Sequence, residues 1–85
     1  MLHDEFRNNI YEEAIRIMIS SFIAEHKRAP VVLDIGTGTG LLAMMCARHG
    51  ADFVFAVEQF EALAKVASNV IARNNMDDKV TKVYY

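Results

Sequence analysis

The chain has 85 residues, a hydrophobic fraction of 53% and a formal net charge of −2, from nine basic and eleven acidic residues. This length allows at most one small domain, and the mixed charges provide no basic stripe for direct binding of nucleic acid. No apolar run approaches the roughly 20 residues of a membrane span, so we expect no membrane contact.

A hydrophobic fraction this high is unusual for so short a chain, because a small domain has little interior in which to bury it. We therefore favour a piece of a larger domain, which packs against the remainder of its own domain or a dimer partner. The alternatives are a small domain with a rich core and one that dimerises. The single Cys46 rules out an internal disulfide and fits a reducing compartment, so we expect a cytoplasmic or nuclear location.

Residues 4–26 are predicted to form one long helix, since no Gly or Pro interrupts them and apolar residues recur at spacings of three and four. That apolar stripe comprises Phe6, Ile10, Ala14, Ile15, Ile17, Met18, Ile19, Phe22 and Ile23. Asp4 is the candidate N-cap, and Arg7 and Tyr11 share a face because they lie four residues apart. Pro30 disfavours helix at the residue before it and so ends the segment.

A buried strand that runs into a glycine-rich turn comes next. Residues 31–35 are apolar apart from Asp34, which is the composition of a strand covered on both faces in a parallel sheet. Three of the four glycines follow within five positions, as Gly36, Gly38 and Gly40. Glycine has no Cβ, so the backbone can turn sharply there and a ligand can come close.

Two helices and two strands complete the pattern. A helix is expected at 41–49, a strand at 53–57 with Glu58 at its carboxyl end, a helix at 60–74 and a more polar strand at 79–85. The predicted fold class is therefore α/β, with an N-terminal helix followed by βαβαβ, which is half of a Rossmann-like parallel sheet. The polar third strand suits a position near an edge of that sheet.

The spacing of the glycines narrows the choice of cofactor. A dinucleotide fingerprint needs its third glycine where this chain has Leu41, and no Gly-Lys-Ser/Thr follows for a P-loop. Asp34 would repel a pyrophosphate but suit a ligand with an ammonium group. Glu58 can accept hydrogen bonds from both hydroxyls of a ribose. A ribose, a cationic group and no phosphate describe S-adenosyl-L-methionine.

Both acids also have simpler interpretations, which stay open from the residues alone. Asp34 can cap or shape the turn, a role that does not exclude ligand binding. Glu58 can be a solvated loop acid or an acid at a helix N-terminus.

Residues 32–40, VLDIGTGTG, resemble motif I of the Rossmann-like S-adenosylmethionine-dependent methyltransferases. Three further segments are similar to segments of the protein arginine N-methyltransferases, and their residues are most like those of the monomethylating type. These are MLHDEFRNNIY at 1–11, GLLAMM at 40–45 and GADFVFAVE at 50–58. The resemblance implies that residues 1–29 are an N-terminal helix closing over the cofactor and residues 30–85 part of the Rossmann-like cofactor-binding domain.

The resemblance also implies roles for single residues. Arg7 would bind the methionine carboxylate, Asp34 would orient the ammonium group, and Glu58 would hold the ribose hydroxyls. Gly36 and Gly38 would let the cofactor approach the backbone closely. The implied cofactor-binding set is Arg7, Asp34, Gly36, Thr37, Gly38, Gly40 and Glu58, with Gly40 allowing the turn to pack closely on the sheet and Tyr11 either beside the cofactor or in the core.

The activity that the resemblance implies is methyl transfer to the guanidinium of a protein arginine, with histones among the candidate substrates. Arginine methyltransferases activate that nitrogen with paired glutamates on a loop after their fourth strand, so we expect these 85 residues to bind the cofactor without being catalytic. No metal site is expected. The alternatives are another class I methyltransferase, acting on a small molecule or a ribosomal protein, and a non-catalytic interaction module.

Overall fold

The computed structural model describes residues 5–84, with side chains described from residue 8 to residue 81. The elements are α1 (Glu5–His26), β1 (Val31–Ile35), α2 (Leu41–Arg48), β2 (Phe53–Glu58), α3 (Glu61–Arg73) and β3 (Val80–Tyr84). The predicted α/β order is confirmed, with boundaries that differ by about one residue from those expected. Asp4, the candidate N-cap, lies outside the described residues. None of the described helices has the length and apolarity needed to cross a membrane.

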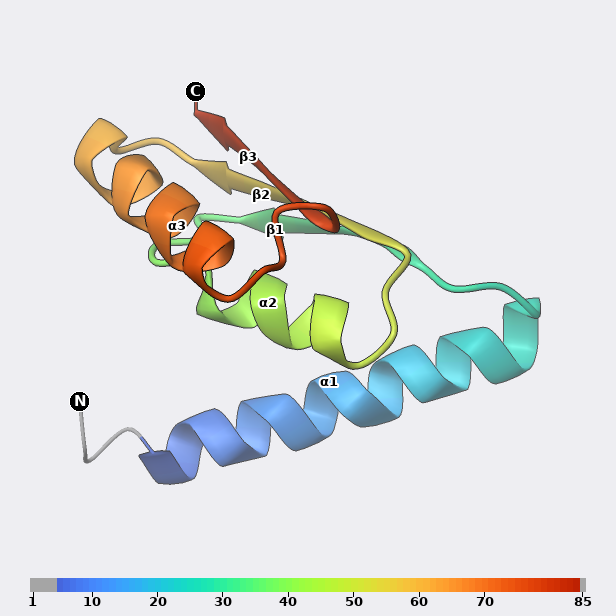
Figure 1. Ribbon diagram of the computed structural model, residues 1–85. Coiled ribbons are helices and arrows are strands. Elements are labelled where there is room, and N and C mark those ends of the chain that lie inside the picture. Colours follow the sequence, from blue (N-terminus) through green and yellow to red (C-terminus); the bar gives the residue numbers. More distant parts are fainter. Residues whose placement is uncertain (1–4, 85) are drawn as a thin grey trace.

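The three strands form one parallel sheet in the order β1-β2-β3. Both α2 and α3 lie against the same face of this sheet (Figure 1), as expected when crossovers of one hand join parallel strands laid side by side in sequence order. The buried core consists mainly of small side chains and comprises Ile19, Ala43, Met44, Cys46, Ala47, Ala51, Val54, Ala56, Ala67, Ile71 and Val80. Among the three described strands the more polar β3 lies at an edge, as predicted, and β1 lies at the other.

Within residues 5–84 the other face of the sheet is open, so the prediction of a strand covered on both faces was wrong for the described part of the chain. Val31, Leu33 and Ile35 of β1 are 56%, 60% and 69% exposed. They lie beside Phe53, Phe55 and Val57 of β2 in register, and the two phenylalanine rings meet edge to face at 5.1 Å. The apolar composition of β1 fits a two-sided cover, but within residues 5–84 the crossover helices lie on one side only.

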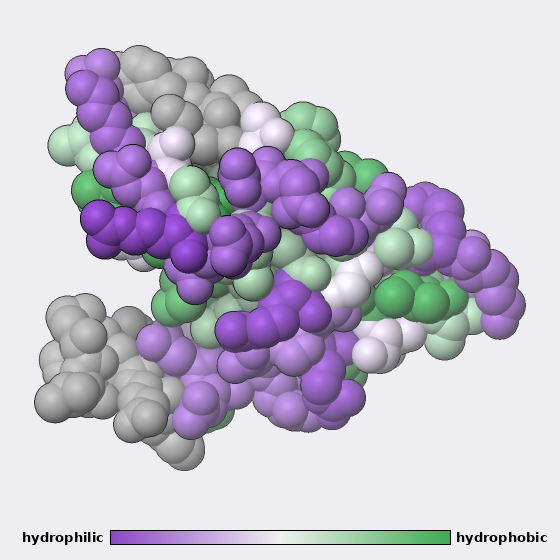
Figure 2. Space-filling model, in the orientation of Figure 1, coloured by the Kyte–Doolittle hydropathy of each residue, from purple (hydrophilic) through white to green (hydrophobic). Residues whose placement is uncertain are grey.

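Helix α1 packs on α2, on the side of that helix away from the sheet (Figure 1). Ile19 is buried and approaches Gly50, whereas Ile10, Ile17 and Met18 are more than half exposed. The apolar stripe predicted for this helix is therefore only partly covered. Figure 2 shows hydrophilic side chains over the outward side of α3 and along much of α1.

Candidate functional site

The glycine turn at residues 36–40 joins the carboxyl end of β1 to the first residue of α2 and is fixed by backbone hydrogen bonds. The Val57 carbonyl at the end of β2 accepts the N–H of Gly36 at 2.8 Å and that of Thr37 at 2.9 Å. The Thr37 carbonyl accepts the Gly40 N–H at 2.9 Å. The turn is thus held against the sheet edge where ligands of open α/β folds bind.

Glu58 lies against this turn, and the residue is only 4% exposed. Oε1 accepts the N–H of Gly38 at 2.8 Å, and Oε2 accepts the N–H of Phe60 at 3.0 Å. These amides, Phe60 first and Gly38 next, lower the pKa of the Glu58 carboxyl, so it is ionised at neutral pH. Each oxygen keeps a second lone pair that can accept a hydrogen bond from a ligand hydroxyl.

Asp34 is tied into the turn by its own hydrogen bond. The buried Thr37 hydroxyl donates from Oγ1 to Asp34 Oδ2 at 2.7 Å. The role of Asp34 in shaping the turn, left open by the sequence, is therefore present in the structure. Since Asp34 is only half-buried, its carboxylate also remains available to a cationic group.

The glycines of the turn divide into two kinds. A Cβ at Gly36 or Gly38 would meet nothing within 4 Å, so both positions face open space. A Cβ at Gly40 would lie 3.2 Å from Ile71 Cδ1 and 3.7 Å from Ala67 Cβ. The expectation that Gly40 lets the turn pack on the sheet is corrected accordingly, because its close neighbours belong to α3.

The structure brings six of the seven predicted cofactor-binding residues to this one edge: Asp34, Gly36, Thr37, Gly38, Gly40 and Glu58. The side chain of Arg7 lies outside the described residues, although its backbone belongs to α1. Tyr11 is 45% exposed on α1, so the interpretation of Tyr11 as a core residue is wrong. Sequence reasoning missed the Phe60 amide as a partner of Glu58, because a main-chain donor leaves no side-chain signal.

A groove of about 310 Å³ lies elsewhere, between α1 and the amino end of β1. Its lining is almost entirely apolar and comprises Met18, Ile19, Phe22, Pro30, Val31 and Val32. Figure 2 shows a hydrophobic area in this region. The groove lacks the carboxylates and glycines that the turn brings together, so the turn is the better candidate for a polar cofactor.

The lowered pKa of Glu58 predicts a loss of stability in acid. Because this pKa lies below the ordinary value of 4.5, the contribution of Glu58 is complete above about pH 4.5 and disappears as the pH falls through the lowered pKa. We expect the midpoint temperature of thermal unfolding to decrease as the pH is lowered below 4.5. This decrease should be less steep in Glu58→Gln. Melting curves between pH 7 and 3 measure both slopes. Equal slopes in the two proteins would contradict the assignment.

Comparison with known proteins identifies the family. The family model of ribosomal protein L11 methyltransferase (PrmA) matches residues 14–85. Protein arginine N-methyltransferase 7 of Danio rerio is 51% identical over 80 residues, which are 94% of this chain and 12% of the relative. The Aedes aegypti protein of the same name is 48% identical over 83 residues, or 98% of this chain and 12% of the relative. The chain thus spans about an eighth of these relatives.

Solved structures agree with the sequence comparison. A crystal structure of PRMT6-SAH has a TM-score of 0.81 and 34% identity, and covers 99% of this chain with 23% of its own length. The Trypanosoma brucei PRMT1 enzyme-prozyme complex with AdoHcy has a TM-score of 0.79 and 30% identity, and covers 99% of this chain with 25% of its own. The resemblance seen in the sequence is confirmed: the chain belongs to the methyltransferase family described by the PrmA model, and it is similar to one part of the protein arginine N-methyltransferases.

Proposed function

We propose that the chain binds S-adenosyl-L-methionine at the glycine turn, as the cofactor-binding part of a protein arginine N-methyltransferase. The observation that carries this proposal is the buried Glu58 carboxylate, held by two backbone amides beneath Gly38. An ionised acid in that place favours hydroxyl donors over phosphates. Two similar structures, PRMT6-SAH and the PRMT1 enzyme-prozyme complex with AdoHcy, contain S-adenosylhomocysteine, which supports the same ligand class here.

The residues present fit such a ligand. The free lone pairs of Glu58 would accept the two ribose hydroxyls, and the open space at Gly36 and Gly38 would admit the ligand to the backbone. Asp34, with one oxygen occupied by Thr37, would receive the ammonium group with the other. Arg7, by resemblance, would pair with the methionine carboxylate.

The bound cofactor supplies an electrophilic methyl group on its sulfonium sulfur. In the parent enzyme an arginine nitrogen would form the new N–C bond as the S–C bond breaks, and the nitrogen proton would pass to a base. Among the described residues, the glycine turn is accompanied by the single acids Asp34 and Glu58, not by a pair of glutamates that could activate a guanidinium. The substrate, with histones among the candidates, and a cytoplasmic or nuclear location are part of this proposal.

A second candidate is methyl transfer to a ribosomal protein, favoured by the match of the PrmA model over residues 14–85. The cofactor site would be the same, so the acceptor separates the two. With the parent enzyme, labelled methyl from S-adenosylmethionine should reach an arginine-containing peptide if the first proposal holds. Transfer to ribosomal protein alone would favour the second.

Titration calorimetry of the chain with S-adenosylhomocysteine, ADP and NAD⁺ tests the cofactor assignment. We expect S-adenosylhomocysteine to bind at least about tenfold more tightly than either nucleotide, because Asp34 and Glu58 would face the phosphates with like charge. Binding of ADP or NAD⁺ with equal affinity would contradict the assignment. Absence of S-adenosylhomocysteine binding would instead favour the non-catalytic interaction module.

A further inference from the structure

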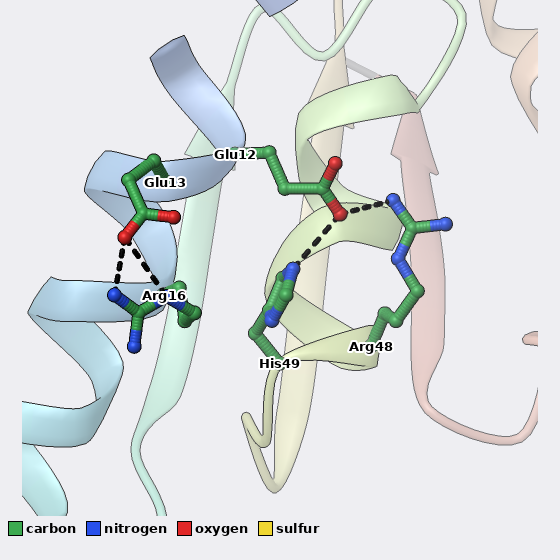
Figure 3. Close-up of polar contacts among 5 residues, drawn as sticks. All are labelled: Glu12, Glu13, Arg16, Arg48 and His49. Atoms are coloured by element: carbon green, nitrogen blue, oxygen red, sulfur yellow. Dashed lines mark hydrogen bonds and ion pairs between the residues drawn. The ribbon is translucent and has the colours of Figure 1, made fainter. Parts of the chain in front are cut away.

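A second polar cluster joins two helices away from the glycine turn (Figure 3). The Glu12 carboxylate on α1 accepts a hydrogen bond through Oε2 from Arg48 Nη2 at 2.6 Å, and the same oxygen lies 2.8 Å from His49 Nε2. Arg48 is the last residue of α2, and His49 is its C-cap. The contact therefore bridges 36 residues of sequence and is tertiary rather than local.

Glu12 continues the face of α1 that packs on α2. Ile15 and Ile19 lie three and seven residues further along, so all three side chains point the same way from a helix. Ile19 is 2% exposed, and Ile15 packs against the core. Ile10 and Tyr11, just before Glu12, are 51% and 45% exposed. Glu12 thus makes a tertiary contact seven residues before the buried Ile19.

This arrangement fixes the direction of the helix. Glu12 and Ile19 are seven residues apart, which corresponds to about 10 Å along a helix at 1.5 Å per residue. A rigid rod held at two points has one orientation, whereas a rod held at its apolar half alone can pivot. The part of α1 on the amino-terminal side of Glu12 includes Arg7 and Tyr11, the residues of this helix with an expected role at the cofactor.

We propose that Glu12 is a positioning residue for cofactor binding. Its contact with Arg48 and His49, called the clasp below, holds the amino-terminal part of α1 in place. Glu12 touches neither the glycine turn nor its ligand, and acts through the direction of α1. The functional half of this inference rests on the proposed function, whereas the orientation of α1 is a property of the fold alone.

The neighbouring Glu13 provides a matched control. Its carboxylate pairs with Arg16, one turn along the same helix, so it points away from α2 (Figure 3). The side chains of Glu13 and Arg16 are each at least half exposed. Replacing Glu13 by Gln removes the same charge from the same helix without touching the clasp.

Spin labels test the orientation directly. Cysteines introduced at the exposed Asn9 on α1 and Ser68 on α3, in a Cys46→Ala background, report the direction of α1 by pulsed dipolar spectroscopy. We expect Glu12→Gln to widen the distance distribution clearly, and Glu13→Gln to leave it unchanged. The double variant Arg48→Gln/His49→Gln removes the clasp from the α2 side and should reproduce Glu12→Gln. Circular dichroism confirms that each variant is folded.

The affinity for S-adenosylhomocysteine, measured on the same proteins, tests the functional half. Glu12→Gln should weaken binding about twofold to fivefold, as expected for one partly exposed ion pair, and Glu13→Gln should not. Equal distance distributions in the two single variants would overturn the clasp, whatever the measured affinity for S-adenosylhomocysteine. A wider distribution with unchanged affinity would overturn the link to the cofactor. If the unmodified chain binds no S-adenosylhomocysteine, the proposed function fails, and the distances still decide the clasp.

Discussion

Gly40→Ala is expected to lower the free energy of unfolding by about 2–4 kcal/mol. Gly40 is the N-cap of α2 and has φ of 89°, a left-handed conformation that costs an L-residue about 1–2 kcal/mol. The new methyl group would also lie 3.2 Å from Cδ1 and 3.3 Å from Cγ1 of Ile71. Ile71 is 2% exposed and has little freedom to retreat, so the strain adds to the backbone cost. Denaturation of the chain in urea measures the loss.

Gly38→Ala separates the two costs. Gly38 has φ of 60°, so it shares the left-handed conformation, but its Cβ would meet nothing within 4 Å. We expect a loss of only about 1–2 kcal/mol at this position. Equal losses at Gly38 and Gly40 would show that the packing of the turn on α3 contributes nothing. The comparison therefore tests the contact that the sequence alone assigned to the wrong partner.

Local patterns predict most of this fold. Apolar residues recurring at spacings of three and four predicted α1 and α3. Apolar runs bounded by proline or glycine predicted β1 and α2. Both signals depend only on neighbours in sequence. The meeting of the turn residues and Glu58 at one edge of the sheet was also predictable. Glycine spacing and an acid at a strand end are local features, and parallel strands bring their carboxyl ends to one edge.

Contacts between distant segments were not predictable in the same way. The clasp of Glu12 with Arg48 and His49 joins side chains 36 and 37 residues apart, and neither partner belongs to a motif. The open face of β1 was missed because the composition of a strand shows that it suits burial, not which segment buries it. Gly40 was assigned to the sheet for a related reason: the approach of α3 to the turn depends on packing across 31 residues.

Glu58→Gln is expected to weaken binding of S-adenosylhomocysteine about tenfold to hundredfold. Hydrogen bonds to an ionised partner contribute about 1.5–3 kcal/mol, and the amide retains one acceptor atom where the carboxylate has two. The single carbonyl oxygen of the variant side chain would accept the N–H of Gly38 or that of Phe60, whereas the carboxylate accepts both. Calorimetric titration at neutral pH, on protein shown to be folded, gives the affinity.

The most direct test of the cofactor site compares this variant with Glu61→Gln in the same titration. Glu61 is an exposed acid in the first turn of α3, three residues beyond Glu58, so the two substitutions change the net charge equally. We expect S-adenosylhomocysteine to bind the unmodified chain and Glu61→Gln alike, and Glu58→Gln at least about tenfold more weakly. Equal affinity in all three proteins would contradict the assignment of Glu58 and its glycine turn as the cofactor site.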